Sequence, residues 1–426
     1  MKVLIVGSGG REHAIAWKLS SSPKLTKLYC APGNPGIGEH AENVAIEAED
    51  NDRIVAFARE KKVDLVVVGP EDPLAAGLVD QLSNAGIRAF GPTKAAAQLE
   101  ADKWFAKAMM RHQAVPTAEA RVFSDIHAAV EYINTRDEPC VIKAVGLAKG
   151  KGVTVCHRTK DAVEAAGKML NDRAFGDASS RIVVEELLHG PECSILAFVS
   201  GRTVYLMESA QDHKPIDDGD SGPMTGGMGA YSPTPVITEA MLQQVQRDIF
   251  VPMLDGLARE GIEYRGVLYA GLMLTVNGPK VLEFNCRFGD PETQPLLMRL
   301  KSDLLDVMLA VIDDRLDQIE VEWDARPTVS VVASSKGYPG AYQIGERIAG
   351  ISAAEEVAGV KVFHSGTTLH GNDLVTAGGR VLAVTAIGDT IADACARAYE
   401  AMGKIHFAGM HYRRDIARQV LHPVSR

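Results

Sequence analysis

The stretch GPKVLEFNCRFGDPETQP, residues 278–295, holds the residue types best suited to chemistry. It predicts a strand over 280–285, on which alternation places Glu283 and Asn285 on the same face. Carboxylate and amide oxygens of this kind suit Mg²⁺, which usually takes one or two protein carboxylates and leaves its other positions to water and phosphate. Arg287 follows on the same side, where its guanidinium could meet a phosphate or a carboxylate. A buried acid, amide and arginine at one strand end are hard to explain as packing alone.

A second stretch, CVIKAVGLAKGKGVTVC at 140–156, predicts two strands joined by a glycine-rich loop. The first strand carries Lys143, and the loop carries Lys149, Gly150, Lys151 and Gly152. Backbone donors of such a loop can close over a triphosphate while the ammonium groups meet its charge. The loop is not a Walker A motif, because the glycine spacing is short, no Ser or Thr follows the lysine, and a strand follows where a helix belongs. A solvated hairpin tip remains the alternative.

Two further polar segments lie between these stretches. RIVVEELLHGPECSI sets Glu185 and Glu186 at the end of an apolar strand and Glu192 after a turn, where they could serve an adenine edge and a ribose or form only an acidic strand end. The loop 211–231 combines Asp212, His213 and Lys214 with the run TGGMGA. Loops of this length are uncommon in compact enzymes and are often functional. A lone histidine in a loop, however, is more often an ordinary polar surface residue than a general base.

The N-terminal stretch VLIVGSGGREHAIAW predicts a strand, a glycine turn and a helix, whose first N–H groups attract anions. A dinucleotide site would need a third glycine where the chain has Glu12, and a ribose-binding carboxylate after the next strand, which is missing. A dehydrogenase is therefore disfavoured. GPEDPL follows another strand of the same predicted sheet, so Gly9, Gly10 and Glu71 could face one crevice. An ordinary turn and helix start would explain GPEDPL equally well.

These residues must be positioned by several units, since 426 residues suggest about three domains. Strands and helices alternate through about residue 92, which favours a parallel sheet covered on both faces. The expected elements are strands 2–6, 25–30, 65–69 and 87–90 and helices 11–20, 52–61 and 73–85. One connecting helix is expected over 93–112. The later expected strands are 140–145, 152–157, 181–186, 192–199, 203–209, 267–275, 280–285, 328–333, 360–364, 373–376 and 380–386, with helices 125–135, 159–171, 238–260, 293–312 and 390–403.

Composition excludes several classes of protein. The chain has 45 Lys+Arg against 55 Asp+Glu, a net charge of -10, which argues against binding nucleic acid or an anionic membrane. Its six cysteines are widely spaced and show no zinc pattern, so we expect reduced thiols. No apolar run approaches a membrane span, and no signal peptide is recognisable. We therefore expect a cytoplasmic protein that is a monomer or a weak homo-oligomer.

The order of the features resembles the ATP-grasp fold: a lysine-bearing strand, a glycine loop, an acidic strand end and a Glu-x-Asn strand. GSGGREHA, GPEDPL, QDHK, TGGMGAYSP and EFNCRFGDPETQP are similar to motifs of the phosphoribosylamine-glycine ligase family, and RFGDPE is the most specific of them. The similarity extends into the last unit through SSKGYPG and TAGGRVL. It implies a multidomain α/β architecture with a Rossmann-like parallel sheet domain at 1–102, an ATP-grasp domain at 103–322 that has a central mixed sheet and a small α+β lid at 115–187, and a mainly β domain at 323–426.

The resemblance also implies a reaction in which ATP, glycine and 5-phosphoribosylamine give glycinamide ribonucleotide, ADP and phosphate through glycyl phosphate, in purine synthesis. It would place at the ATP site Lys103, Lys143, Lys149, Gly150, Lys151, Gly152, Glu185, Glu186, Leu187, Leu188 and Glu192. It would place at the phosphoribosylamine site Gly9, Gly10, Arg11, Glu71, Gly226, Gly227 and Arg380, with the first three holding the 5-phosphate. The catalytic residues would be Arg287, Lys214 and Asp212, and the Mg²⁺ or Mn²⁺ ligands Glu283 and Asn285.

One departure from the superfamily concerns the metal. Many ATP-grasp enzymes carry a further metal carboxylate on the strand before the Glu-x-Asn strand, whereas Leu272 and Met273 stand at that place here, so we expect a single protein-held ion. Another ATP-grasp ligase with a different acid or amine, and a non-catalytic nucleotide-binding protein of the same fold, remain as alternatives. The second would be expected to lose Glu283, Asn285 or Arg287, and all three are present.

Overall fold

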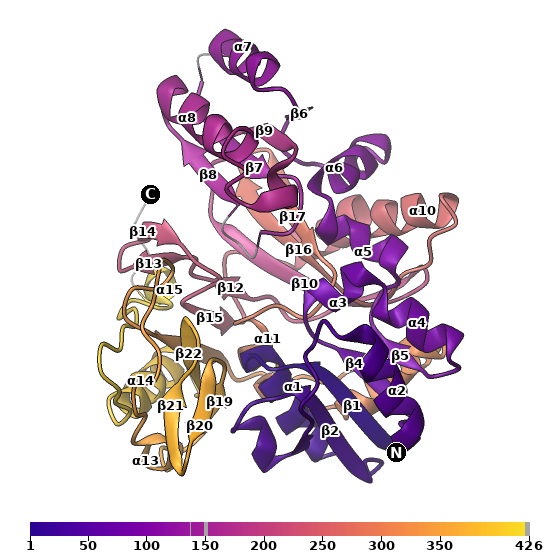
Figure 1. Ribbon diagram of the computed structural model, residues 1–426, viewed down its shortest axis with the longest axis vertical. Helices are drawn as coiled ribbons and strands as arrows, with labels where there is room; N and C mark the ends of the chain where they lie inside the picture. The colour runs from indigo at the N-terminus through magenta and orange to yellow at the C-terminus, as the bar shows by residue number, and fades with distance from the viewer. Residues whose placement is uncertain (137, 149–151, 422–426) are drawn as a thin grey trace.

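The computed structural model describes residues 1–136, 138–148 and 152–421, and Figure 1 shows their arrangement. The N-terminal sheet has five parallel strands in the order β3-β2-β1-β4-β5. Their bounds are β1 Lys2–Gly7, β2 Lys27–Pro32, β3 Glu42–Asn43, β4 Leu65–Val68 and β5 Ala89–Phe90. Val3 and Ile5 pack on the side of α1 (Gly10–Ser20), and Leu4 and Val6 on the side of α2 (Asn51–Lys61). Covering on both faces explains why the strands are continuously apolar.

Three helices predicted as single elements are each broken in two, and the third of them, 293–312, is α11 (Thr293–Arg299) and α12 (Leu304–Ile312). The predicted helix 73–85 is α3 (Glu71–Ala76) and α4 (Leu78–Asn84), separated at Gly77, whose φ of 90° is left-handed. The predicted helix 93–112 is α5 (Lys94–Ala101) and α6 (Lys103–His112). Asp102 separates them, because its extended backbone and its carboxylate, which accepts from the N–H groups of Trp104 and Phe105, begin a new helix.

A small sheet lies at the end of the molecule opposite the N-terminal sheet (Figure 1). Its antiparallel strands, in the order β6-β9-β7-β8, are β6 Ala120–Phe123, β9 Ile182–Glu186, β7 Cys140–Ala144 and β8 Val153–Cys156. The helices α7 (Ile126–Arg136) and α8 (Thr159–Leu170) share an apolar core with this sheet. β6 was not predicted, because it is a short edge strand with no buried residue and therefore no apolar run.

The central sheet is antiparallel throughout and not mixed as expected, with the order β11-β10-β16-β17. Its strands are β10 Glu192–Ser200, β11 Thr203–Leu206, β16 Arg265–Thr275 and β17 Gly278–Asn285. One face packs on α5, α6 and the continuous helical segment α9 (Glu239–Val245), η3 (Gln246–Phe250) and α10 (Val251–Arg259). The other face packs toward the N-terminal sheet and on α11 (Thr293–Arg299) and α12 (Leu304–Ile312), which Asp303 separates by capping α12.

The C-terminal sheet includes two strands from the polar segment 211–231, which the sequence predicted as a loop. Its order is β12-β15-β18-β22-β19, with β12 Gln211–Asp212, β15 Gly229–Ser232, β18 Thr328–Ser334, β19 Val360–His364 and β22 Arg380–Ile387. Between β12 and β15 lies a hairpin of β13 (Pro215–Asp217) and β14 (Ser221–Met224). A second hairpin joins β20 (Thr367–His370) and β21 (Asp373–Thr376), and the helices are α13 (Ile351–Glu355), α14 (Ile391–Met402) and α15 (Arg418–Leu421). Asp212 consequently lies where the central and C-terminal sheets meet. No helix of the described ranges is long and apolar enough to span a membrane.

Candidate active site

One face of the central sheet carries the polar side chains. Ser194, Gly271 and Glu283 face one another across β10, β16 and β17, and Tyr269 lies opposite Asn285 in the next row. The prediction that Glu283 and Asn285 share a face is confirmed by this register. The opposite face is an apolar core, so the chemistry is confined to one side of the sheet.

The residue opposite Glu283 on the preceding strand is Gly271, which corrects the sequence-based expectation. Leu282 forms a bulge in β17 that shifts the register, so Gly271 pairs with Glu283 while Leu272 pairs with Val281. Leu272 lies in the apolar core of the opposite face. A bulge could not be foreseen from strand alternation, because alternation alone assumes an unbroken register.

Four cations surround the carboxylate of Glu283. Burial alone would raise the pKa of Glu283, but the charges of Lys214, Lys143, Lys103 and Arg287 outweigh it and hold the pKa below its usual value. The described part of the chain has no group of three or more acidic, His or Cys side chains that could hold a metal. Glu283 and Asn285 nevertheless fit Mg²⁺, which accepts few protein oxygens when phosphates supply the rest.

Arg287 is held by two carboxylates and an amide. Its Nη2 lies 2.8 Å from Glu100 Oε1, its Nε lies 3.3 Å from Glu71 Oε2, and it donates to Asn285 Oδ1 at 3.1 Å. Burial would raise the pKa of Glu71, but Arg287 and Arg11 lower it; burial raises the pKa of Glu100 despite Arg287. Glu71 therefore reaches the same site as Arg287. Sequence reasoning missed Glu100, because α5 looked like a connecting helix and carried no motif.

The lysines of the predicted nucleotide side surround Glu185, which is 2% exposed. Lys143 Nζ lies 2.8 Å from Glu185 Oε2, and Lys107 Nζ lies 3.3 Å from Oε1. Lys103 donates to the carbonyl of Gly146 at 3.2 Å. Two lysines therefore pair with the carboxylate of Glu185 in this structure, and its placement at an adenine edge stays a prediction. Lys107 was missed.

The remaining residues predicted for ATP lie on both sides of this cluster. Leu188 packs with Ala118, Met273 and Leu282 in a small apolar cluster that suits an adenine ring, and Leu187 precedes it on the chain. Glu186 pairs with Lys280 at 2.9 Å, away from the other lysines. Gly152 packs tightly, since a Cβ there would lie 2.6 Å from that of Ala148. Lys149, Gly150 and Lys151 lie outside the described residues.

Asp212 and Lys214 reach the site from β12 and the turn after it. Lys214 Nζ lies 3.2 Å from Glu192 Oε2, so Glu192 is paired with a lysine in this structure. Burial raises the pKa of Asp212 to about 7, and the negative charges of Glu292 and Glu192 add to it against the charge of Lys214. His213 points the other way, because its Nε2 accepts from the N–H of Ala417 in the C-terminal unit. His213 is therefore not placed as a general base.

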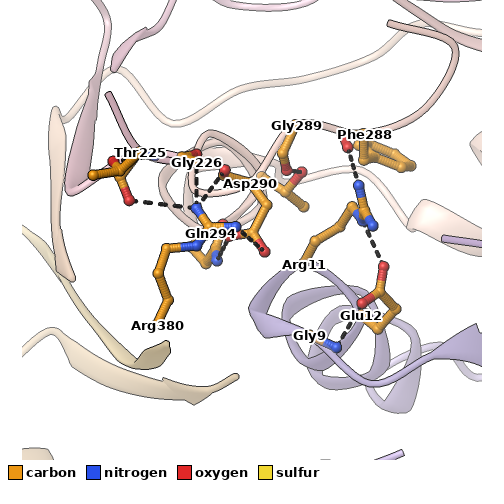
Figure 2. Close-up of polar contacts among 12 residues, drawn as sticks. Gly9, Arg11, Glu12, Thr225, Gly226, Phe288, Gly289, Asp290, Gln294 and Arg380 are labelled. Atoms are coloured by element: carbon orange, nitrogen blue, oxygen red, sulfur yellow. Dashed lines mark hydrogen bonds and ion pairs between the residues drawn. The ribbon is translucent and has the colours of Figure 1, made fainter. Parts of the chain in front are cut away.

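The glycine turn after β1 is closed by an internal hydrogen bond (Figure 2). The Gly9 N–H donates to Glu12 Oε2 at 2.7 Å, and Arg11 pairs with Glu12 and donates to the carbonyl of Phe288 at 3.0 Å. Glu12 is 2% exposed and fills the space that a Cβ on Gly7 would need. The expectation that Gly9 donates to a phosphate is wrong, because its N–H is occupied. A Glu three residues after Gly9 is a capping-box signal that could have been recognised.

Arg380 joins three distant motifs beside this turn (Figure 2). Its Nη1 donates to the carbonyls of Gly226 at 2.8 Å and Asp290 at 2.7 Å, with a longer contact to Gly227 at 3.4 Å. Its Nη2 lies 3.2 Å from Asp290 Oδ2. The structure therefore brings Arg380, Gly226 and Gly227 together as predicted, close to Gly10, where an added Cβ would lie 3.7 Å from Asp290 Oδ1.

Glu292, also in the RFGDPE motif, is a site residue that sequence reasoning did not single out. It is 2% exposed, and its Oε1 accepts from Tyr269 Oη at 2.7 Å and from Ser194 Oγ at 3.1 Å. Both donors stand on the polar face of the central sheet, in the rows of Asn285 and Glu283. The RFGDPE motif thus supplies a buried carboxylate beside Glu283 and Asn285, the predicted metal ligands.

A central antiparallel sheet with Glu283 and Asn285 on its polar face, facing a lysine-bearing smaller sheet, defines the ATP-grasp class of fold. Family models for the N domain, the ATP-grasp (A) domain and the C domain of phosphoribosylglycinamide synthetase match residues 1–100, 101–293 and 328–419. The chain belongs to the phosphoribosylglycinamide synthetase family.

Individual relatives match over their full length. A phosphoribosylamine-glycine ligase of Rhodopirellula baltica is 50% identical over 426 residues, 98% of each chain, and one of Salmonella typhimurium is 50% identical over 420 residues, again 98% of each. The crystal structure of the Thermotoga maritima phosphoribosylamine-glycine ligase has a TM-score of 0.87 and 33% identity and covers 98% of this chain and 100% of its own. A biotin carboxylase of Campylobacter jejuni, at 15% identity and a TM-score of 0.73 over 96% and 92% of the two chains, shares the fold alone.

Proposed function

We propose that this chain joins glycine to 5-phosphoribosylamine with cleavage of ATP, giving glycinamide ribonucleotide, ADP and phosphate in purine synthesis. Family membership and the names of the full-length relatives support this reaction. The structural observation that carries it is the polar face of the central sheet, where Glu283, Asn285 and Arg287 meet lysines from three other segments.

The first step transfers the terminal phosphoryl group of ATP to the carboxylate of glycine, which gives glycyl phosphate. Lys103 and Lys143 approach Glu283 from the nucleotide side and Lys214 from the other side, so positive charge surrounds the place of transfer. Arg287 is fixed by Glu71 and Glu100 and stabilises the transferring phosphate. Glu283 and Asn285 would hold Mg²⁺ or Mn²⁺, which neutralises phosphate charge when bound. Because positioning and charge carry the rate, no protein nucleophile is needed.

The second step is attack of the phosphoribosylamine nitrogen on the acyl phosphate. We assign this substrate to the region between the glycine turn and Arg380, with Gly10, Arg11, Gly226 and Gly227 around it. Gly9 shapes the turn through Glu12 rather than donating to the phosphate.

The division of the chain into domains at 1–102, 103–322 and 323–426, with 115–187 as a lid, is also part of this proposal. The small sheet β6-β9-β7-β8 with its own apolar core supports the lid. Burial of all six free cysteines supports a reducing, cytoplasmic location. We expect a monomer or a weak homo-oligomer.

An ADP-release assay with ATP, Mg²⁺, glycine and freshly generated phosphoribosylamine tests the reaction, with each substrate omitted in turn. We expect ADP release only when both glycine and the amine are present. ADP release that continues without either one would contradict the proposal, and release with another acid in place of glycine would point to a different ATP-grasp ligase.

A further inference from the structure

Glu292 is a buried carboxylate that forms no ion pair among the described residues. Its hydrogen-bond partners are the neutral hydroxyls of Tyr269 and Ser194, and the charges of Arg287 and Arg380 act on it only at longer range. The neighbouring carboxylates differ, since Glu185 is paired with lysines and Asp290 with Arg380. A buried charge is normally paired, so the carboxylate of Glu292 can accept a cation in direct contact.

Asp212, near the same region, is a second carboxylate without a direct ion pair among the described residues. It is partly buried and has no ion pair within the described ranges; the charge of Lys214 acts on it, but Lys214 is paired with Glu192. The backbone places it there: Ala210, two residues earlier, bridges to Ser194, whose hydroxyl holds Glu292. Two carboxylates from separate motifs therefore flank one small region beside the polar face of the sheet.

The floor of this region is Gly271. An added Cβ on Gly271 would lie 3.6 Å from Glu283 Cγ and 3.9 Å from the Tyr269 ring, which are ordinary contacts. The backbone would therefore tolerate a side chain at position 271. Steric strain does not explain why this residue is a glycine and why the space above it is open. It lies between Ser194 and Glu283 in the same row of the sheet.

We propose that Glu292 and Asp212 bind the α-ammonium group of glycine above Gly271, and that this subsite selects glycine from other acids. The inference rests on the proposed function, which requires the glycine carboxylate to lie beside Glu283 and Arg287. The ammonium group of the same small molecule then falls next to that row, where the two carboxylates form no ion pair with any described residue. The phosphoribosylamine nitrogen suits this place less well, because it must be neutral to attack.

Glu292→Gln tests the proposal, since glutamine keeps an acceptor for Tyr269 and Ser194 and removes only the charge. We expect the KM for glycine to rise about 100-fold, as for loss of one partner of a buried charge pair, while the KM for ATP changes less than about 3-fold. Asp212→Asn should act in the same direction. Tyr205→Phe is a matched control, because its hydroxyl donates to the carbonyl of Val321 at 2.8 Å, away from this site.

Gly271→Ala provides a test that does not depend on the acidic variants folding. It should raise the KM for glycine about 10-fold with ATP binding retained, because a methyl group occupies the proposed place of the substrate. Calorimetric titration of glycine into protein saturated with a non-hydrolysable ATP analogue should show weaker binding in each of the three variants. A glycine KM within about 3-fold of the parent in both Glu292→Gln and Gly271→Ala, or a loss confined to the phosphoribosylamine KM, would overturn the subsite. Absence of glycine-dependent ADP release in the parent protein would instead overturn the proposed function.

Discussion

The nucleotide side of the site, around Glu185, has an excess of positive charge. The side proposed to bind the ammonium group of glycine, around Asp212 and Glu292, is the amine side and has an excess of negative charge. On the nucleotide side, Lys103, Lys107 and Lys143 surround the single carboxylate of Glu185, and burial lowers the pKa of Lys107 to about 8. On the amine side, Asp212 and Glu292 form no direct ion pair among the described residues, and burial raises the pKa of Asp212 to about 7.

The difference shows that each side lacks the charge that its ligand brings. A triphosphate would favour the charged form of Lys103 and Lys107, whose pKa burial lowers, and an ammonium group would favour the charged form of Asp212, whose pKa burial raises. Burial of these groups costs free energy in the ligand-free protein, and binding of a ligand of opposite charge recovers part of that cost. The comparison makes the following predictions, which differ between the two sides.

Glu283→Gln should have the largest effect, because Glu283 stands between the two sides and is proposed to hold the metal ion. We expect kcat/KM to fall by more than about 1000-fold, with the melting temperature shifted by less than about 3 °C. Steady-state ADP release and thermal unfolding measure the two quantities, and the exposed Glu322→Gln serves as control. Retained turnover with a large loss of melting temperature would show a structural role instead.

Lys143→Met should weaken both ATP binding and the fold. The substitution leaves the buried Glu185 with Lys107 as its one remaining ion-pair partner among the described residues, so we expect a loss of about 3 kcal/mol in the free energy of unfolding and a rise of about 50-fold in the KM for ATP. Urea unfolding without ligands measures the first term. In the control Lys280→Met, which removes the more exposed pair with Glu186, the loss should stay below about 1 kcal/mol. Equal losses in the two variants would refute the role of burial.

The sequence was sufficient for the features that follow from local periodicity. Alternation placed Glu283 and Asn285 on one face, and the apolar runs located most strands of the four main sheets, although not β3, β6, β12 or β15. The capping of the glycine turn by Glu12 was also readable, but the fingerprint comparison took Glu12 only as a missing glycine.

Features set by contacts distant in the sequence could not be predicted. Glu100 and Lys107 gain their roles because α5 and α6 pack against β17 and the small sheet, and nothing in their own helices indicates it. The pairing of β12 and β15 with a sheet formed about 100 residues later likewise depends on tertiary structure. The environment of Glu292 is set by Tyr269 and Ser194, which are distant in the sequence, so its lack of an ion pair could be recognised only in the structure.

Asp212→Asn should stabilise the ligand-free protein, in contrast to Lys143→Met. A carboxyl with a pKa of about 7 in the folded state and about 4 when unfolded carries no penalty below pH 4 and loses stability as the pH rises to 7. At pH 8 the variant should therefore be more stable than the parent by about 2 kcal/mol, and at pH 4 the two should be equal. Urea unfolding at both pH values measures this, and a parent protein that gains stability relative to the variant between pH 4 and 8 would contradict it.

Tyr269→Phe should have the smallest effect, because it removes one of two hydrogen bonds that orient Glu292 and leaves its charge. We expect the KM for glycine to rise about 5-fold, equivalent to one net hydrogen bond, with the KM for ATP unchanged. A rise in the KM for ATP as large as the rise in the KM for glycine would show that Tyr269 also acts on the nucleotide side, and would contradict the prediction.

The most direct measurement is a crystal structure with a non-hydrolysable ATP analogue, Mg²⁺ and glycine. We predict that the terminal phosphate lies between Lys143 and Glu283, and that the glycine ammonium nitrogen lies about 3 Å from the carboxylates of Glu292 and Asp212. Glycine bound in the reverse direction, with its carboxylate toward Glu292, or bound away from Gly271, would contradict the account.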